Sequence, residues 1–376
     1  MSARKNPNGA GSVRKRADGR WEGRYTAPDG RQKSVYARTK TDCQQALKLR
    51  LAQITTGAYF EPSRMTLGEW LETWLNDYCG HIKPTTRQTY RMFLWTHIVP
   101  AIGAVKLGQL SAVHVQRAFN AMDISPSSQR SVRIALSSAL SAAVRFGLIG
   151  SNPCEHLTLG KPSRRQMVIV DRDRFGAFVA AAKDTPVAAA LILLLQTGIR
   201  SGELRGLRWS DVDLDAATLT VSRQMTFTRD LGHHIATPKS GASRTVALMP
   251  ETVALLREHR RAQMEARLAG GWVDTDLTRD LVFRFADGQF YGREILGRYA
   301  AKVGAAIGLP DLHPHDLRHS YAVAALRSGV DVKTVQNNLG HASAAMTLDT
   351  YAAYTSDMGR AAASKMSAFW AENTPG

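Results

Sequence analysis

Two short polar segments that both contain Pro-Ser-Arg divide the chain and most strongly constrain how it can fold. The first, EPSRMT, spans residues 61–66, and the second, LGKPSRRQ, spans residues 159–166. Such segments are typical of linkers, because few of their side chains can join a hydrophobic core. With 376 residues, the chain is long enough for two or three separate cores. We therefore predict domains over residues 1–60, 66–155 and 165–376.

The first domain has the pattern of a three-stranded sheet followed by one helix. Asp18-Gly19 and Asp29-Gly30 are turn dipeptides between stretches with two-residue alternation. Four residues can build one apolar side: Trp21, Tyr25, Val35 and Tyr36. The pattern turns helical from about residue 41, with one face formed by Ala46, Leu47 and Leu51. The exposed face of the sheet would carry basic side chains that suit a DNA groove, or that merely contact water: Arg14, Lys15, Arg16, Arg20, Arg24, Arg31 and Lys33.

The second domain has helical spacing throughout. The capping-box pair Thr66 and Glu69 indicates the start of a first helix. A second helix would start at Pro84, with another capping-box pair in Thr85 and Gln88, and a third at Ser111. The motif SPSSQ would start a fourth helix that ends at Gly147. We expect the tryptophans in the core rather than stacked on bases. Five basic residues are candidates for a DNA-facing side: Lys83, Arg87, Arg91, Arg130 and Arg133.

The third domain has the pattern of helices around a small sheet. VAAALILLLQTG predicts a buried helix that ends at Gly198. Strands are predicted for ATLTVSRQ, HHIATPK and SRTVALM, with SGA as a turn between the last two, and LVFRFADGQ adds another extended stretch. From Arg293 onward the pattern is mainly helical. The expected fold class is therefore multidomain, mainly α with small β-sheets (α+β).

The excess of basic residues indicates the class of molecule that the chain binds. Lys and Arg number 49 against 32 Asp and Glu, which gives a net charge of +17, and +9 of this charge falls in the first 60 residues. Such an excess favours binding to a polyanion, most simply nucleic acid, although a basic tail that only aids solubility would also produce it.

Other features indicate a cytoplasmic protein. The longest apolar run, Val187–Leu195, is too short to span a bilayer, and the N-terminus lacks the apolar core of a signal peptide. The three cysteines, Cys43, Cys79 and Cys154, form neither a disulfide framework nor a metal clip. We therefore expect a reducing compartment, namely the cytoplasm of a bacterial host cell.

Four motifs in the last domain carry side chains suited to one kind of chemistry. They supply Arg200 (TGIRSGEL), Lys239 (TPKSGASRTV), His315 and Arg318 (HPHDLRHSYA), and His341 and Tyr351 (LGHASAAMTLDTY). Two arginine forks can stabilise a phosphoryl transition state without a metal. A tyrosine hydroxyl, with a pKa of about 10, becomes a nucleophile when a histidine takes its proton. A lysine can return a proton to the departing oxygen. The set is complete for phosphoryl transfer onto tyrosine.

HPHDLRHSYA also allows a zinc site. His315 and His319 have the four-residue spacing of H-E-x-x-H proteins, and His341 is a conceivable third ligand. However, Arg318 would place a fixed cation beside the metal, and Asp316 is one methylene shorter than the usual base. We therefore expect no metal, and the sequence has no nucleotide-binding G-x-x-x-x-G-K-[ST] loop. No cofactor is predicted.

The four motifs resemble those of the tyrosine recombinases, the family of phage integrases and their relatives. TGIRSGEL matches the first arginine box, HPHDLRHSYA the His-x-x-Arg box, and LGHASAAMTLDTY the last box with its histidine and tyrosine. Three boxes in this order, with the lysine hairpin between them, are highly specific, and the resemblance covers the whole chain. It implies an arm-type DNA-binding domain (1–60), a helical core-type DNA-binding domain (66–155) and a catalytic domain (165–376).

The resemblance implies which residues hold the phosphate. Arg200 and Arg318 would clamp the scissile phosphate, and His341 would donate a hydrogen bond to one of its oxygens. Glu203, three residues after Arg200, stands where the family usually has an acidic residue that supports the site. Alternatively, Glu203 could simply cap a helix or pair with Arg205.

The resemblance also implies which residues move protons. Tyr351 would attack the phosphate, leaving a 3′-phosphotyrosyl link and a free 5′-hydroxyl. His315 would be the base and Lys239 the general acid, although a hairpin lysine is often merely solvated. Tyr354 is a rival nucleophile outside the matched motif. The remaining histidines are expected in structural, loop or surface positions: His233, His234, His313 and His319.

The implied partners are double-stranded DNA, with core-type and arm-type sites, and three further copies of the chain that exchange strands through a Holliday junction. The resemblance also allows for a host DNA-bending protein and an excisionase. The apolar positions Met358, Ala362, Met366, Phe369 and Trp370 predict a C-terminal helix that docks on a neighbouring protomer or packs within its own chain.

The arm-like domain favours an integrase of a phage or prophage. Three alternatives remain open: a transposon-borne recombinase, an enzyme like type IB topoisomerases, and a DNA-binding regulator with an inactive site.

Overall fold

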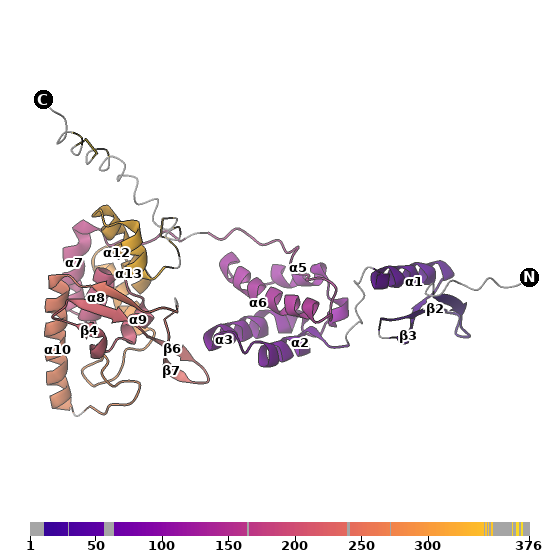
Figure 1. The fold of residues 1–376 in the computed structure, drawn as a ribbon, viewed down its shortest axis with the longest axis horizontal. Coiled ribbons are helices and arrows are strands. Elements are labelled where there is room, and N and C mark those ends of the chain that lie inside the picture. The colour runs from indigo at the N-terminus through magenta and orange to yellow at the C-terminus, as the bar shows by residue number, and fades with distance from the viewer. Residues whose placement is uncertain are drawn as a thin grey trace, which may run out of the picture. The chain divides into compact units, whose positions relative to one another are not determined.

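The computed structural model describes residues 11–28, 30–55, 64–163, 165–238, 241–270 and 272–341, together with residues 343, 345, 347, 348, 363, 366, 367 and 370. The chain separates into two compact units, residues 1–164 and 165–376 (Figure 1). Helices predominate and all the sheets of the described residues are small and antiparallel, which confirms the predicted α+β class. Among the same residues, no helix is both long and apolar enough to cross a membrane.

The first unit begins with the predicted sheet and helix. Strands β1 (Ser12–Lys15), β2 (Trp21–Thr26) and β3 (Gln32–Ala37) pair antiparallel in that order, and α1 (Lys40–Thr55) packs on one face. Gly23 in β2 permits this close packing, because a Cβ atom there would lie 3.2 Å from the Cys43 sulfur. Tyr25, Ala27 and Leu47 form the core. Tyr36 was expected on this apolar side but lies on the opposite face, where it is 50% exposed.

The rest of the first unit is a helical bundle with its own core. Its elements are α2 (Leu67–Thr73), the π-helix η1 (Trp74–Tyr78), α3 (Pro84–Phe93), the π-helix η2 (Leu94–Ile98), α4 (Val99–Ile102), the 3₁₀ turn η3 (Leu107–Gln109), α5 (Ala112–Asn120) and α6 (Pro126–Arg145). The Thr66–Glu69 capping box forms as predicted. The Thr85–Gln88 box is wrong, because α3 already begins at Pro84 and Thr85 therefore lies inside its first turn. Trp70 and Trp74 are buried in the core, as expected.

The second unit surrounds the buried helix α8 (Ala188–Thr197), against which α7 (Arg172–Lys183), α10 (Pro250–Gly270), α11 (Ile295–Ala306) and α12 (Pro314–Arg327) pack. The short helix α9 (Ser201–Arg205) and the 3₁₀ turn η4 (Trp209–Asp211) follow α8, and α13 (Val332–Leu339) packs on α12. Leu191, Leu193 and Leu194 of α8 are almost fully buried at the centre of the largest core.

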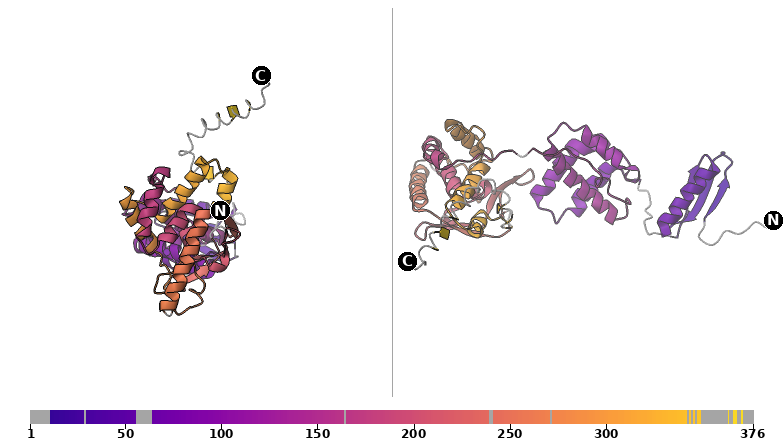
Figure 2. Two further views of the ribbon diagram at one scale, coloured as in Figure 1. Left: turned by 90° about the vertical axis from the view of Figure 1, so that its left-hand side faces the viewer. Right: turned by 90° about the horizontal axis from the view of Figure 1, so that it is seen from above.

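The sheets of this unit differ from the expected pairing. Strands β4 (Val212–Asp213), β5 (Thr218–Val221) and β8 (Arg244–Ala247) form one sheet, whereas β6 (Gln224–Thr228) and β7 (Gly232–Ala236) form a separate hairpin. One strand of this hairpin, β6, contacts α9, and the far end of the hairpin extends away from the helices of its unit (Figures 1 and 2). The expected SGA turn therefore does not join paired strands, because β8 pairs with β5. LVFRFADGQ forms only isolated bridges.

The predicted C-terminal helix lies mostly outside the described residues. Of its five apolar positions, Met366 and Trp370 are described, and their exposed fractions are 53% and 61%. Its docking in cis or in trans stays a prediction.

Candidate active site

Gly198 shapes the first part of the site. It adopts φ = +66°, which ends α8, and the chain then turns so that Arg200 becomes the N-cap residue of α9. Glu203 stands at the third helical position, where its Oε2 accepts from the Arg200 main-chain N at 2.9 Å. Its Oε1 accepts from Arg200 Nη1, also at 2.9 Å. The motif T-G-I-R-S-G-E is therefore a turn that fixes one arginine head group.

Asp316 shapes the second part by starting α12. The helix follows the N-cap residue His313 with Pro314 at its first position, and Asp316 accepts from the His313 main-chain N at 2.9 Å. Asp316 also pairs with Arg165 at 3.2 Å. Its carboxylate therefore caps a helix. This cap explains why an aspartate stands where zinc proteases have a catalytic glutamate.

Arg318 lies deep in the second unit and is 1% exposed. Its Nη1 donates to the Gly198 carbonyl at 2.7 Å, and its Nη2 donates to the Leu339 carbonyl at 2.6 Å. A guanidinium is planar and rigid, so these two bonds set the orientation of its head group.

Three consecutive carbonyls at the end of α13 each accept a hydrogen bond from a different arginine. Asn338 O accepts from Arg244 Nε at 2.8 Å, Leu339 O from Arg318 Nη2 at 2.6 Å, and Gly340 O from Arg200 Nη2 at 3.2 Å. The last carbonyls of a helix lack intrahelical partners and form the negative end of its dipole, so cations are favoured there. We refer to these carbonyls of residues 338–340 as the α13 carbonyl cluster.

His341 follows the α13 carbonyl cluster directly. Its Nδ1 lies 2.9 Å from Oγ1 of the buried Thr347. Partial burial, followed by the positive charges of Arg318 and Arg200 and by smaller effects from His319 and His315, lowers the pKa of His341 to about 4. The neutral ring therefore predominates at pH 7.

His315 and His319 lie edge to face, with ring centroids 4.5 Å apart. Burial, followed by the charge of His315, lowers the pKa of His319 to about 4. His315 is exposed at the surface, whereas His319 is half-buried. The two rings are thus not equivalent, and the exposed His315 is the better placed to meet a substrate. Of the other histidines, His233 lies in β7 with its ring near Phe227 and Phe290, not in a loop.

The structure thus brings together five of the seven residues predicted for the site: Arg200, Glu203, His315, Arg318 and His341. Lys239 and Tyr351, together with the rival Tyr354, lie outside the described residues. Within the described part of the chain, no group of three His, Cys, Asp or Glu side chains has an arrangement that could hold a metal ion.

Arg244 in β8 was missed by the sequence analysis. Its Nη1 and Nη2 donate to Glu203 Oε1 at 3.1 Å and Oε2 at 2.6 Å. Its side chain is 10% exposed, and that of Glu203 is fully buried. Arg244 lies five residues after Lys239, within the motif TPKSGASRTV. The alternation of residues in a strand does not predict that its side chain reaches α9 and α13.

The open face of the N-terminal sheet carries some of the predicted basic residues. Glu22 in β2 is nearly buried there and accepts from Arg14 Nε at 2.6 Å and Ser34 Oγ at 2.9 Å, and Arg24 Nε lies 3.4 Å away. The hydrogen bonds from Arg14 and Ser34 lower the pKa of Glu22 to about 2.

Other basic residues of this sheet lie elsewhere. Lys15 and Lys33 pair with Trp21 and Tyr25, so strand alternation places them on the α1 side. Arg20 pairs with Asp18 at 2.9 Å next to the first turn. The predicted basic face is therefore concentrated around the carboxylate of Glu22.

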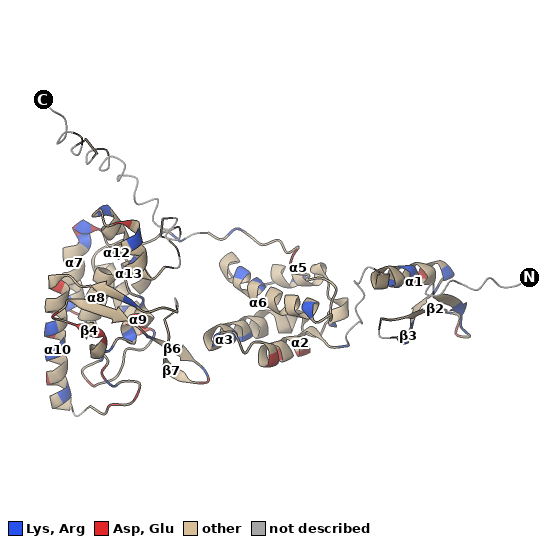
Figure 3. Ribbon diagram, viewed as in Figure 1, with Lys and Arg blue, Asp and Glu red and all other residues tan. Residues whose placement is uncertain are grey.

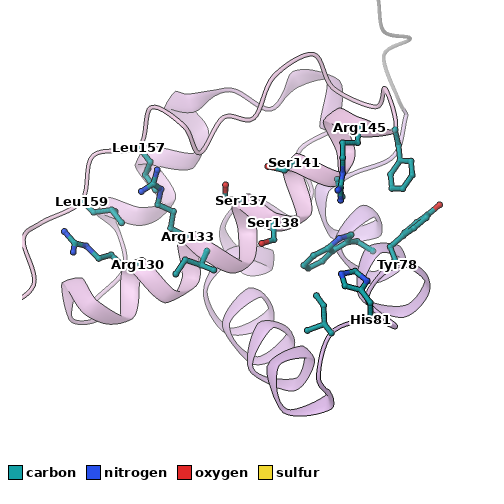
Figure 4. Close-up of a pocket in the computed structure, with 15 residues that line it drawn as sticks. Tyr78, His81, Arg130, Arg133, Ser137, Ser138, Ser141, Arg145, Leu157 and Leu159 are labelled. Carbon is teal, nitrogen blue, oxygen red and sulfur yellow. The ribbon is translucent and has the colours of Figure 1, made fainter. Parts of the chain in front are cut away.

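A groove of about 1010 Å³ runs along α6 in the helical bundle. Arg130, Arg133 and Arg145 line it together with Ser137, Ser138 and Ser141, and Tyr78 and His81 lie across from α6 (Figure 4). Helix α6 carries three arginines and no acidic residue (Figure 3).

The remaining basic candidates of the bundle lie in and before α3. Lys83 follows the groove residue Ile82, and Arg87 lies one turn into α3. Arg91 does not line the groove, because it pairs with Glu72 at 3.0 Å and stacks on Trp95.

Comparison with known proteins identifies the family of the chain. Residues 170–357 match the family described as "Phage integrase family", and residues 66–122 match "Phage integrase, N-terminal SAM-like domain". A putative prophage phiRv2 integrase of Mycobacterium tuberculosis is 28% identical over 90% of both chains. A "Tyrosine recombinase XerC-like" protein of Caldanaerobacter subterraneus subsp. tengcongensis is 27% identical, covering 85% of this chain and 87% of its own.

Two solved structures share the fold. An integrase of the transposon Tn1549, in complex with transposon right end DNA, superposes with a TM-score of 0.70 at 19% identity, covering 81% of this chain and all of that chain. A lambda integrase tetramer bound to a Holliday junction gives a TM-score of 0.56 at 19% identity, covering 90% of this chain and 97% of its own.

Proposed function

The chain belongs to the phage integrase family, and we propose that it is a tyrosine-type site-specific recombinase that forms a 3′-phosphotyrosine at Tyr351. The observation that carries this proposal is the convergence of Arg200, Arg318 and His341 on the α13 carbonyl cluster. These groups come from three separate motifs, and together they offer donors to one phosphate.

The two arginines are proposed to bind the scissile phosphate. Arg200 keeps 23% of its side chain exposed, so its guanidinium can meet DNA while Glu203 holds it from behind. Arg318 is anchored by two carbonyls, and its fixed positive charge would stabilise the negative charge that grows in the transition state. Because their charges do not titrate near neutral pH, no metal is required for this stabilisation.

His341 is proposed to donate to a phosphate oxygen. When Thr347 donates its hydroxyl proton to Nδ1, the neutral ring carries its own proton on Nε2. The low pKa of His341 keeps the ring neutral at pH 7, so this donor is present without charging the site.

The covalent step exchanges one phosphoester for another. The Tyr351 oxygen attacks phosphorus as its proton passes to His315, the bond from phosphorus to the 5′ oxygen breaks, and Lys239 gives that oxygen a proton. A 5′-hydroxyl from a second DNA reverses the step and restores the backbone. Because the phosphotyrosine retains the energy of the original ester, neither ATP nor a cofactor is needed.

Two surfaces are proposed to bind duplex DNA. The helical bundle (66–155) would use the α6 groove, where Arg130, Arg133 and Arg145 have no carboxylate partner on the same helix. The N-terminal sheet (1–60) would contact a second, arm-type site through Arg14 and Arg24. Residues 165–376 would carry the catalytic site, and four protomers would exchange strands through a Holliday junction.

The relatives favour integration of a mobile element as the biological role, because they include a putative prophage integrase and a transposon integrase. We propose a phage or prophage integrase, with a transposon-borne recombinase as the second candidate. A host DNA-bending protein and an excisionase remain proposed partners.

A recombination assay tests the function. Fragments that carry the DNA flanking this gene in its source genome would be incubated with the protein and a second copy of the site, and recombinant products would be measured. Recombinants from wild type and from Tyr354→Phe, but none from Tyr351→Phe, are expected. Relaxation of unrelated supercoiled plasmids without recombinants would instead indicate a topoisomerase, and tight binding without either product would indicate a DNA-binding regulator.

A further inference from the structure

We infer that Arg244 is a positioning residue that acts through Glu203 to hold Arg200 in its phosphate-binding orientation. This inference rests on the proposed recombinase function and adds a residue to its machinery. Arg244 and Arg200 approach the same carboxylate from opposite elements, β8 and the start of α9.

The geometry divides the carboxylate of Glu203 between the two arginines. Oε1 accepts from Arg200 Nη1 at 2.9 Å and from Arg244 Nη1 at 3.1 Å, whereas Oε2 accepts from the Arg200 main chain at 2.9 Å and from Arg244 Nη2 at 2.6 Å. All four hydrogen bonds go to a side chain with no exposed surface. Without Arg244, the Glu203 carboxylate would interact with Arg200 alone, and this stronger attraction would pull the Arg200 guanidinium away from a phosphate.

Arg244 also holds the α13 carbonyl cluster. Its Nε donates to Asn338 O, and its guanidinium carbon lies 3.2 Å from the position that a Cβ atom on Gly340 would occupy. Gly340 has φ = +62°, so a residue without a side chain both permits this contact and tolerates the backbone conformation. Since Gly340 O in turn accepts from Arg200, Arg244 controls the position of Arg200 from two sides.

Arg244 itself is not placed to touch DNA. Its hydrogen bonds to Glu203 and Asn338 point inward, and its side chain is 10% exposed. We therefore expect its loss to slow DNA cleavage without weakening DNA binding. This separation distinguishes Arg244 from Arg200 and Arg318, which are proposed to contact the phosphate.

The first test measures single-turnover cleavage of a nicked suicide fragment and DNA affinity in parallel, with the full-length chain. Arg244→Gln should lower the cleavage rate about 100-fold, the scale of a reacting group misplaced by about 1 Å, while Kd changes less than about twofold. Arg244→Lys should recover part of the rate, because it keeps the charge but not the fork. Should Arg244→Gln fail to fold, Arg244→Lys carries the test alone, and a wild-type rate from it would overturn the inference.

A matched control separates positioning from general stability. Arg284 is buried in the same unit, pairs with Asp274 at 2.6 Å and donates to the Gly288 carbonyl at 2.6 Å, but it lies outside the candidate site. Arg284→Gln should lower the thermal midpoint while leaving the cleavage rate of the folded protein within about threefold of wild type. Equal rate losses for Arg244→Gln and Arg284→Gln would overturn the inference.

Two further readouts report the coupling to Glu203. In a Glu203→Gln background, Arg244→Gln should lower the cleavage rate by less than about threefold, because each substitution alone already breaks the Glu203–Arg244 ion pair. The pH profile should also change. Burial raises the pKa of Glu203, but hydrogen bonds and charge from Arg244, with help from Arg200, hold it below the usual value.

The direction of the pH effect follows from these opposing influences. Loss of Arg244 leaves burial less opposed, so the pKa of Glu203 rises and the group gains a proton as the pH falls. The ratio of the Arg244→Gln rate to the wild-type rate should therefore decrease from pH 8 to pH 6. The inference would be overturned if the rate losses of Arg244→Gln and Glu203→Gln were additive and the ratio of the Arg244→Gln rate to the wild-type rate did not change with pH.

Wild-type protein distinguishes the two possible failures. If wild type forms no adduct on DNA that it binds tightly, the proposed function fails and this inference fails with it. If wild type forms the adduct and Arg244→Gln forms it equally fast, the inference alone fails.

Discussion

Arg318 Nη1 donates to the main-chain oxygen of Gly198 at 2.7 Å, across 120 residues of sequence. The bond joins α12 to the turn that ends α8, two residues before Arg200. The conformation of one glycine therefore sets the positions of both arginines that are proposed to bind phosphate.

Gly198→Ala should disrupt this junction. A Cβ atom would lie 2.4 Å from Tyr321 Cδ1 and 2.9 Å from Leu339 Cδ2, and φ = +66° is itself unfavourable for alanine. We expect a loss of about 3 kcal/mol or more in the free energy of unfolding, measured with urea. Gly308→Ala is the matched control, because φ is +76° but nothing lies within 4 Å. It should lose only about 1–2 kcal/mol, and equal losses would refute the steric argument.

Stability should fall in acid because of two histidines. His319 and His341 have pKa values of about 4 in the fold, below the usual 6.5. As the pH falls from about 6.5 to 4, the unfolded chain binds protons that the folded chain does not, so the free energy of unfolding decreases. Thermal midpoints between pH 7.5 and 4.5 should fall less steeply for His319→Gln than for wild type. The same exchange at the exposed His156 should leave the slope unchanged. A slope unaffected by His319→Gln would contradict this assignment.

The α6 groove should contribute directly to the salt dependence of DNA binding. Arg130→Ala is expected to reduce the slope of log K against log salt by about 0.9, the value for one lost phosphate contact. Arg91→Ala is the control from the same bundle, because Arg91 is engaged by Glu72, Asn76 and Trp95. The slope of log K against log salt for Arg91→Ala should equal that of wild type. A larger change for Arg91 than for Arg130 would move the proposed DNA surface from α6 to α3.

Local sequence signals predicted the local parts of this structure well. Thr66 with Glu69, Gly198 and Asp18-Gly19 each act within a few residues, so their caps and turns could be predicted without knowledge of the fold. The motif order predicted that Arg200, His315, Arg318 and His341 would meet.

The remaining features depend on long-range packing. The pairing of β8 with β5 and the bonds from Arg244 to α9 and α13 join segments 25 to 94 residues apart, and residue alternation within one strand carries no record of them. The placement of Lys15 and Lys33 on the α1 side required the register of the sheet. The catalytic roles of all the predicted site residues, including Lys239 and Tyr351, remain predictions.

Covalent trapping on DNA tests the central claim most directly. Nicked suicide fragments from the flanking DNA would be incubated with the protein in EDTA, denatured in detergent and analysed by mass spectrometry for the modified residue. We predict an adduct on Tyr351 that forms without metal, persists in Tyr354→Phe and disappears in Tyr351→Phe. An adduct on another residue, a reaction abolished by EDTA, or tight binding without any adduct would contradict the account.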